Sequence, residues 1–187
     1  MNEPPLRAPG ALVRPATVAD AAALGAMRAA QQAELAGGTA YAAGIAAYAD
    51  ACTAFFAREL GRPDAWVLGW IATAGTGTGD AADAAPAGSA VLTLAPGMPR
   101  FEPGRSGHAH GSPDGRIRSI YVVPAARRRG LARALTLAAI AEAERRGVGR
   151  LMLGASDAGR PLYEALGFVA KGDEMVYAPA AAPEAAV

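Results

Sequence analysis

One stretch of this chain, Arg116 to Ala139, restricts the possible folds more than any other. Its first part, RIRSIYVV, is rich in β-branched and aromatic residues, and this composition predicts a strand. Pro124 has no backbone N–H group and ends that strand. After a short turn, three arginines and Gly130 precede a run of helix-forming residues that ends at Gly147. The stretch therefore predicts a strand, a proline turn and the start of a helix in succession.

This arrangement predicts an anion-binding site at the start of the helix. The first N–H groups of a helix have no partner within it and carry a partial positive charge. Gly130 has no Cβ, so a phosphate can come close to the backbone there. The neighbouring arginines can add charge-assisted hydrogen bonds that suit phosphate geometry. The alternative is structural: a solvated, basic helix start whose remaining turns pack in the core.

Two motifs resemble those of a known enzyme family. R-x-x-G-x-A, formed by Arg127, Gly130 and Ala132 after a strand that ends in V-V-P, resembles the acetyl-CoA motif of the GCN5-related N-acetyltransferases. There the motif holds the pyrophosphate arm of coenzyme A. A later stretch, Ala155 to Phe168, ends in L-Y-E-A-L-G-F and resembles the late motif of the same family. The two motifs stand in the family's order, with one predicted helix and one predicted strand between them.

The resemblance covers about residues 12–177 and implies an α/β fold with a mixed, twisted sheet and helices on both faces. In the family two central parallel strands separate, and acetyl-CoA enters the gap. Composition and turn residues predict the individual elements. Strands are expected at 11–15, 65–73, 89–95, 116–123, 149–154 and in a final hairpin of 168–169 with 174–177, helices at 17–35, 41–60, 130–147 and 156–167, and a flexible hairpin loop at 75–88.

The resemblance implies which residues would bind acetyl-CoA. The backbone of Tyr121, Val122 and Val123 would bind the pantetheine arm and the acetyl carbonyl as an added strand does. Ser156 stands where many relatives have asparagine, and its hydroxyl can still bond the pantetheine arm. The residues expected to hold the pyrophosphate are Arg128, Arg129, Gly130, Leu131, Ala132 and Arg133.

Tyr163 matches the family's general acid, which protonates the leaving thiolate of coenzyme A. A phenol has a reference pKa of about 10 and stays protonated at neutral pH, whereas a thiol lies near about 8.5. The proton is therefore available, although its transfer is not strongly downhill. The alternative role of Tyr163 is packing against Leu166 and Phe168.

The general base is left open. Relatives often place a glutamate on the strand before Ser156, but this chain has Leu151, Met152 and Leu153 there. Water relayed to bulk solvent is as good an explanation as any side chain. His108 and His110 stand two residues apart, but no cysteine or acidic partner lies at ligand spacing, so we expect no metal. The candidate bases are Glu34, Glu102, His108, His110 and Asp114.

The implied reaction is transfer of an acetyl group from acetyl-CoA to a primary amine, by direct attack within a ternary complex. The acceptor would be a small molecule or a protein or peptide amine. In the family the acceptor site is formed by segments that correspond to residues 33–41 and 96–115. Neither carries a dense acidic cluster, so a polycationic acceptor is not specifically indicated.

Two alternatives belong to other functional classes. A non-catalytic acyl-CoA sensor of the same fold would explain the missing carboxylate, but not the intact motif around Tyr163. A nucleic-acid-binding module could use Arg127–Arg133. Against this second alternative stand a formal net charge of +1 and the lack of an aromatic stacking platform near those arginines.

The whole chain is typical of one soluble domain. Its 187 residues suffice for a sizeable core, and 52% of them are hydrophobic, which excludes disorder throughout. The single cysteine, Cys52, fits a reducing compartment. The sequence predicts a flexible segment at 1–10, one domain at 11–177 and a disordered tail at 178–187. We expect a cytoplasmic protein that binds neither nucleic acid nor membrane, and a homodimer is one of the oligomeric states left open.

Overall fold

The computed structural model describes residues 6–8, 11–37, 44–74, 85–97, 112–172 and 174–177. Their strands form one eight-stranded sheet in the order β1-β2-β3-β4-β5-β6-β8-β7, and within this described part only β5 and β6 pair in parallel. The strands are β1 (Leu6–Ala8), β2 (Ala11–Pro15), β3 (Val67–Ala74), β4 (Pro86–Ala95), β5 (Asp114–Val122), β6 (Arg150–Leu153), β7 (Val169–Lys171) and β8 (Glu174–Tyr177). The helices are α1 (Ala21–Leu35), α2 (Ile45–Leu60), α3 (Leu131–Arg145) and α4 (Arg160–Glu164), with 3-10 turns at Val18–Asp20 and Pro124–Ala126. The predicted mixed α/β sheet is confirmed.

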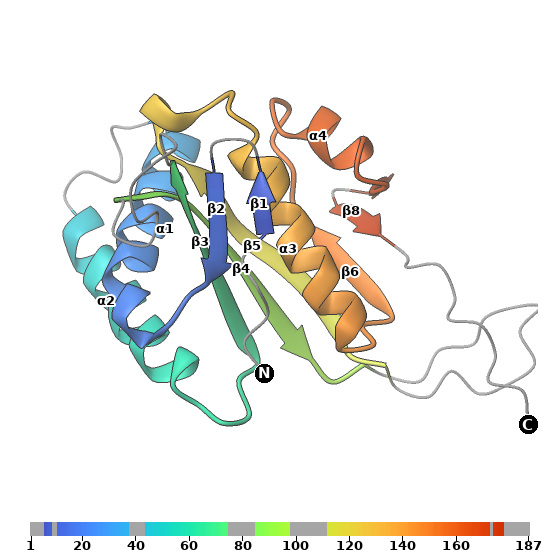
Figure 1. Cartoon of the computed structure of the whole chain (residues 1–187), viewed down its shortest axis with the longest axis horizontal. Helices are drawn as coiled ribbons and strands as arrows, with labels where there is room; N and C mark the ends of the chain where they lie inside the picture. The colour runs from blue at the N-terminus through green and yellow to red at the C-terminus, as the bar shows by residue number, and fades with distance from the viewer. Residues whose placement is uncertain are drawn as a thin grey trace, which may run out of the picture.

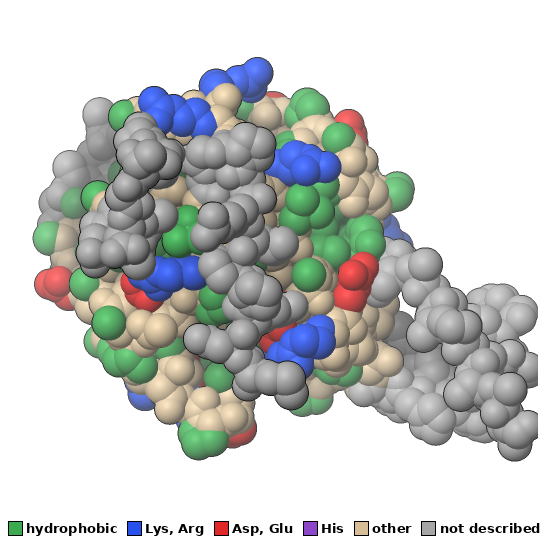
Figure 2. Space-filling model, viewed as in Figure 1, with side chains coloured by type: hydrophobic (Ala, Val, Ile, Leu, Met, Phe, Trp, Pro, Cys, Tyr) green, Lys and Arg blue, Asp and Glu red, His purple; other side chains and the backbone are tan. Residues whose placement is uncertain are grey.

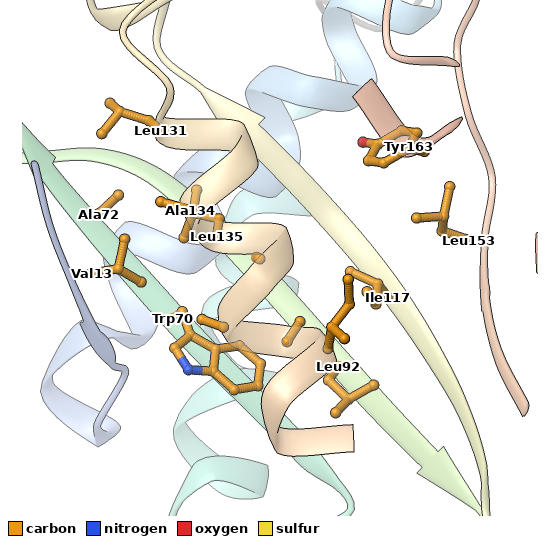
Figure 3. Close-up of a cluster of buried hydrophobic side chains, with 14 of the residues drawn as sticks. Val13, Trp70, Ala72, Leu92, Ile117, Leu131, Ala134, Leu135, Leu153 and Tyr163 are labelled. Carbon is orange, nitrogen blue, oxygen red and sulfur yellow. The ribbon is translucent and has the colours of Figure 1, made fainter. Parts of the chain in front are cut away.

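Helices cover both faces of this sheet (Figure 1). On one face, Leu131 and Leu135 of α3 are buried in the same cluster as Leu92 of β4 (Figure 3). On the other, Leu24 of α1 belongs to a second buried cluster together with Val91 of β4. The adjacent residues Val91 and Leu92 thus enter different cores, as the two-residue period of a strand requires. Burial on both faces explains why β4 consists mainly of small and apolar residues.

The two helices on the second face approach each other closely. A Cβ placed on Gly25 of α1 would lie 2.3 Å from the Thr53 hydroxyl oxygen and 2.8 Å from the Ala49 carbonyl oxygen of α2. Only glycine fits that contact without a shift of the helices. The contact fixes the position of α1, which packs against β5.

The parallel pair β5–β6 separates part of the way along β5. Its register ends where Ile117 lies opposite Leu153, whereas β5 continues to Val122. Beyond Ile117, the edge of β5 that faces β6 has no strand partner among the described residues. A bulge accompanies the separation: the β4–β5 register shifts nearby, and Ser119 takes a φ of +55°. An open strand edge therefore lies in the middle of the sheet.

All the predicted helices and strands are present, but β4 and α4 differ in extent from the prediction, and one further strand was not predicted. β4 begins at Pro86 rather than Ser89, so the end of the predicted loop 75–88 is strand, while residues 75–84 lie outside the described part. Proline is tolerated there because it is the first residue of the strand. α4 begins at Arg160, not after a cap at Ser156, because Ser156 closes a turn of its own with the N–H of Gly159.

The third difference lies at the N-terminus. β1 forms within residues 1–10, where the sequence predicts no strand, and it pairs antiparallel with β2. The predicted start of the second helix, at residues 41–43, lies outside the described residues, and α2 is seen from Ile45. The predicted tail at 178–187 also lies outside them.

Asp20 fixes the start of α1. Its buried carboxylate accepts hydrogen bonds from both terminal nitrogens of Arg14, at 2.7 and 2.8 Å, and from the backbone N–H of Thr17 at 2.8 Å. The bond to Thr17 confirms the predicted capping pattern. The Arg14 guanidinium is the main cause that holds the pKa of Asp20 below its usual value.

Asp20→Asn should therefore destabilise the protein by about 1.5–3 kcal/mol at pH 7, the usual loss for hydrogen bonds to a charged group. Because the folded pKa is lowered, this stabilisation is present above the unfolded value of about 4 and is lost as the pH falls through the folded value. Urea unfolding at pH 7 and pH 3 measures the difference, which should shrink in acid. Asp64→Asn, which removes the exposed partner of Arg62, is the control and should change stability little. A difference that does not change with pH would contradict this account.

Candidate active site

The loop between β5 and α3 presents unpaired backbone donors. Gly130 is the N-cap of α3, with a φ of +80° that suits glycine, and a Cβ there would meet no atom within 4 Å. The first N–H that donates back to it is that of Ala134, at 3.0 Å. The N–H groups of Leu131, Ala132 and Arg133 therefore have no acceptor within the helix. These residues form an open, electropositive helix start of the predicted kind.

Exposed guanidinium groups surround this helix start. Arg128, Arg129 and Arg133 are exposed, and none of them has a hydrogen-bond or ion-pair partner among the residues that the structure describes. Arg128 takes a φ of +63°, an uncommon conformation for a side-chain-bearing residue. Figure 2 shows Lys and Arg side chains along the rim of the molecule where the loop before α3 lies in Figure 1. A phosphate group at this rim would meet both charged side chains and free N–H groups.

Arg127 has a different role from its neighbours. Its Nη2 contacts both carboxylate oxygens of Glu34 at 2.7 Å, and its Nε donates to the Val122 carbonyl at 2.9 Å. The Tyr121 hydroxyl donates to the same Glu34 carboxylate at 2.9 Å. Arg127 is the main cause that lowers the pKa of Glu34. This ion pair joins α1 to the loop before α3 and makes Glu34 a poor general base.

The open edge of β5 presents two residues rather than the three predicted. The Val123 N–H donates to the Ala87 carbonyl of the adjoining strand at 2.9 Å, so it is used by the sheet. Along a strand, the N–H and C=O groups of successive residues point to opposite edges. Because the N–H of Val123 points to β4, the groups of Tyr121 do so as well, and those of Ile120 and Val122 point to the open edge. Side chains reach the carbonyls there, since Gln31 Nε2 donates to Ile120 at 2.9 Å. Ile120 is a candidate that the motif comparison missed and that alternation could have indicated.

A pocket of about 200 Å³ lies beside this edge. It is bounded by α1, by β5 around the bulge, by the end of β6 and by α4. No carboxylate of a described residue lines it. The residues that line the pocket are Arg28, Gln31, Leu35, Arg116, Ile117, Arg118, Ser119, Ile120, Leu153, Gly154 and Tyr163.

Tyr163 brings an unpaired hydroxyl to the pocket. Its side chain is 8% exposed, and its ring packs edge-on against Phe168 with 6.1 Å between the ring centroids. The hydroxyl has no hydrogen-bond partner among the described residues. In Figure 3 its oxygen is turned toward β5 and away from Leu153. Burial raises the pKa of Tyr163, so the hydroxyl keeps its proton at neutral pH. The ring of Tyr163 thus packs in the core, while its hydroxyl lies at the pocket.

The remaining predicted residues lie away from the pocket or outside the described residues. Asp114 is at the opposite end of β5, roughly 20 Å from Ile120 at the usual rise of a strand, and contacts Arg150 at 3.7 Å. Ser156 is exposed, and its hydroxyl accepts the N–H of Gly159 at 3.3 Å. Glu102, His108 and His110 lie outside the described residues.

The described residues contain neither a metal-ligand cluster nor a membrane-spanning helix. These residues contain no group of three or more His, Cys, Asp or Glu side chains placed to hold a metal ion. None of their helices is both long enough and apolar enough to cross a membrane.

Comparisons with known proteins agree with the fold and with the motifs. Residues 106–178 match the acetyltransferase (GNAT) domain family. A GCN5-related N-acetyltransferase from Ralstonia eutropha JMP134 is similar in structure, with a TM-score of 0.65 and 27% identity, over 87% of this chain and 95% of that one. No curated protein matches the sequence significantly.

Two further structures contain the expected cosubstrate or its product. A predicted acetyltransferase from Clostridium acetobutylicum, with acetyl-CoA, has a TM-score of 0.66 and 21% identity, over 87% of this chain and 92% of that one. The PaiA N-acetyltransferase from Thermoplasma acidophilum, in complex with coenzyme A, has a TM-score of 0.60 and 14% identity, over 89% and 96%. Residues 106–178 thus match the GNAT domain family, and the fold, with its separated central strands and glycine-capped α3, supports the assignment of the chain to the GCN5-related N-acetyltransferase superfamily.

Proposed function

We propose that this protein transfers an acetyl group from acetyl-CoA to a primary amine of a small molecule or a peptide. One observation carries the proposal above the others. The open edge of β5 connects two features of the site. At one end is the helix start at Gly130 with its free N–H groups, and at the other is the pocket lined by Tyr163, whose hydroxyl has no described partner. A long ligand with phosphates at one end and a reactive group at the other fits such a path.

The residues of the helix start suit the pyrophosphate of acetyl-CoA. The N–H groups of Leu131–Arg133 would bind phosphate oxygens, and Arg128 and Arg129 would add charge-assisted bonds. The open space at Gly130 lets the phosphate reach the backbone. Along β5, the open-edge groups of Ile120 and Val122 would bond the pantetheine amides as a neighbouring strand does.

The pocket end supplies the catalytic groups. When bound, acetyl-CoA supplies a thioester whose acetyl carbon is attacked by the acceptor amine. The open N–H groups of β5 are the donors available to the carbonyl oxygen as it gains negative charge. Tyr163 donates its proton to the sulfur as the carbon–sulfur bond breaks, and recovers a proton from solvent. The amine's surplus proton goes to water or to one of the candidate bases outside the described residues, Glu102, His108 and His110; no described carboxylate lines the pocket.

A screen of acetyl-CoA against a panel of amines, amino acids, peptides and amine antibiotics tests the proposal. The release of free thiol, together with mass spectrometry of the acceptor, should reveal acetylated products. If acetyl-CoA binds in calorimetry but no amine is acetylated, the chain is a non-catalytic acyl-CoA sensor. DNA binding with a steep salt dependence would instead support the nucleic-acid alternative. The structure weakens that alternative, because Glu34 neutralises the charge of Arg127.

Arg129→Ala should weaken acetyl-CoA binding about 10- to 100-fold. The loss of a hydrogen bond to a charged group costs roughly 1.5–3 kcal/mol, and each 1.4 kcal/mol is about tenfold in affinity. Calorimetric titration with acetyl-CoA measures the change. Arg62→Ala, an exposed arginine in the turn after α2, is the control and should bind normally. Equal affinities in the two variants would remove Arg129 from the phosphate site.

A further inference from the structure

Three guanidinium groups meet at the pocket beside Tyr163. Arg116 and Arg118 stand two residues apart on β5 and so project from the same face of the strand. Arg28 comes from α1, which packs against β5. No described carboxylate lines the pocket with them. The wall where an acceptor would lie is therefore cationic.

Only one of the three charges has a carboxylate partner among the described residues. Arg116 forms an ion pair with Glu174 of β8. Arg28 donates to two neutral groups, the Gln31 side-chain oxygen and the Tyr48 hydroxyl, each at 3.1 Å. Arg118 has a single long bond, from Nε to the Thr93 hydroxyl at 3.4 Å. Arg28 and Arg118 thus have no ion-pair partner among the described side chains, and Glu174, which pairs with Arg116, offsets the charge of Arg118 only weakly.

These charges also repel one another. The pKa of Arg118 is lowered, first by partial burial and then by the nearby guanidinium groups of Arg116 and Arg28. Like charges held near one another raise the free energy of the empty protein, and an anion bound between them relieves that repulsion. Guanidinium is well suited to this task, because its planar fork matches carboxylate and phosphate oxygens.

We propose that the acceptor is a small primary amine that also carries an oxyanion, a carboxylate or a phosphate, and that Arg118 and Arg28 bind this oxyanion. The inference rests on the proposed acetyl transfer and names its substrate class. The pocket volume of about 200 Å³ agrees with a small acceptor, since drug-sized sites measure roughly 300–1,000 Å³. A polycationic amine would bring further positive charge to a wall that already lacks anions.

Matched acceptor pairs test the inference directly. Leucine is compared with leucinamide, and O-phosphoethanolamine with ethanolamine, with spermidine as the polycation. Each kcat/KM is corrected for the fraction of deprotonated amine. The oxyanion-bearing member of a productive pair should be the better acceptor by at least about tenfold, the lower bound for a charged hydrogen bond. The two pairs separate carboxylate from phosphate recognition.

Variants assign the preference to the named arginines. In Arg118→Gln the preference for the oxyanion-bearing member should fall about 10- to 100-fold, mainly through KM. Arg118→Lys should keep part of this preference, because lysine keeps the positive charge but lacks the planar guanidinium that can bind two oxygens at once. Arg28→Gln provides an independent second variant. Arg62→Gln, an exposed arginine that does not line the pocket, is the control and should keep the parent preference.

A binding measurement makes the test independent of turnover. Both members of each pair are titrated into the protein in the presence of coenzyme A, and leucine or O-phosphoethanolamine should bind more tightly than the counterpart that lacks the oxyanion. Equal binding and equal use of the members with and without an oxyanion, or a preference for spermidine, would overturn the inference while the proposed transfer stands. Failure of every amine to release thiol would instead refute the transfer, and the titrations would still decide whether the pocket binds oxyanions.

Discussion

Tyr163→Phe should lower turnover about 10²- to 10⁴-fold, the usual contribution of a general acid. The substitution keeps the ring that packs on Phe168 and removes only the hydroxyl, which has no partner among the described residues. Acetyl-CoA affinity and melting temperature should therefore change little. Turnover, calorimetric affinity and thermal melting are measured on one preparation. The defect should be smaller with an acyl donor whose thiol leaves more easily, because less proton donation is then required.

Tyr177→Phe is the matched control. Tyr177 packs against the same Phe168, with ring centroids 5.5 Å apart, but its hydroxyl donates to Glu144 and does not line the pocket. It should affect stability slightly and turnover not at all. Near-parent turnover in Tyr163→Phe, with chemistry shown to be rate-limiting, would remove Tyr163 from the mechanism. Solvent would then be the proton source.

The fold could be predicted from sequence where local signals and tertiary structure agree. Pro124 ends β5, Gly130 adopts the left-handed conformation at the start of α3, and Gly147 does the same after its end. Each position is determined by the backbone chemistry of one residue. β1 could not be predicted this way, because three residues form a strand only through pairing with β2.

The geometry of the free helix start could be predicted from the sequence, whereas that of the pocket could not be predicted to the same extent. The bulge on β5 places a non-glycine residue, Ser119, at positive φ, which runs against the propensity of serine and depends on the neighbouring strands. The cationic wall depends on packing in the same way. Arg28 and Arg118 are distant in sequence and meet only because α1 lies on β5. A comparison of sequence motifs can detect neither the bulge nor the cationic wall.

Gly130→Val should weaken acetyl-CoA binding more than 100-fold, a loss above about 2.8 kcal/mol. Valine is strained at a φ of +80°. Its branched Cβ would also enter the open space through which a phosphate reaches the N–H groups of Leu131–Arg133. If residue 130 relieves the strain by moving out of the left-handed region of φ, the N–H groups of Leu131–Arg133 no longer point toward one phosphate. Either response removes several hydrogen bonds to a charged group, each worth roughly 1.5–3 kcal/mol.

Gly147→Val separates strain from loss of the phosphate site. Gly147 lies just past the other end of α3, with a φ of +65°, and a Cβ added there would have no atom within 4 Å, so valine meets the same backbone penalty. Both variants should lose similar stability in urea unfolding, of order 1–3 kcal/mol for a side chain held in a disfavoured conformation. Only Gly130→Val should lose acetyl-CoA affinity in calorimetric titration. A folded Gly130→Val protein that binds acetyl-CoA as tightly as Gly147→Val would show that the phosphates do not lie at the start of α3.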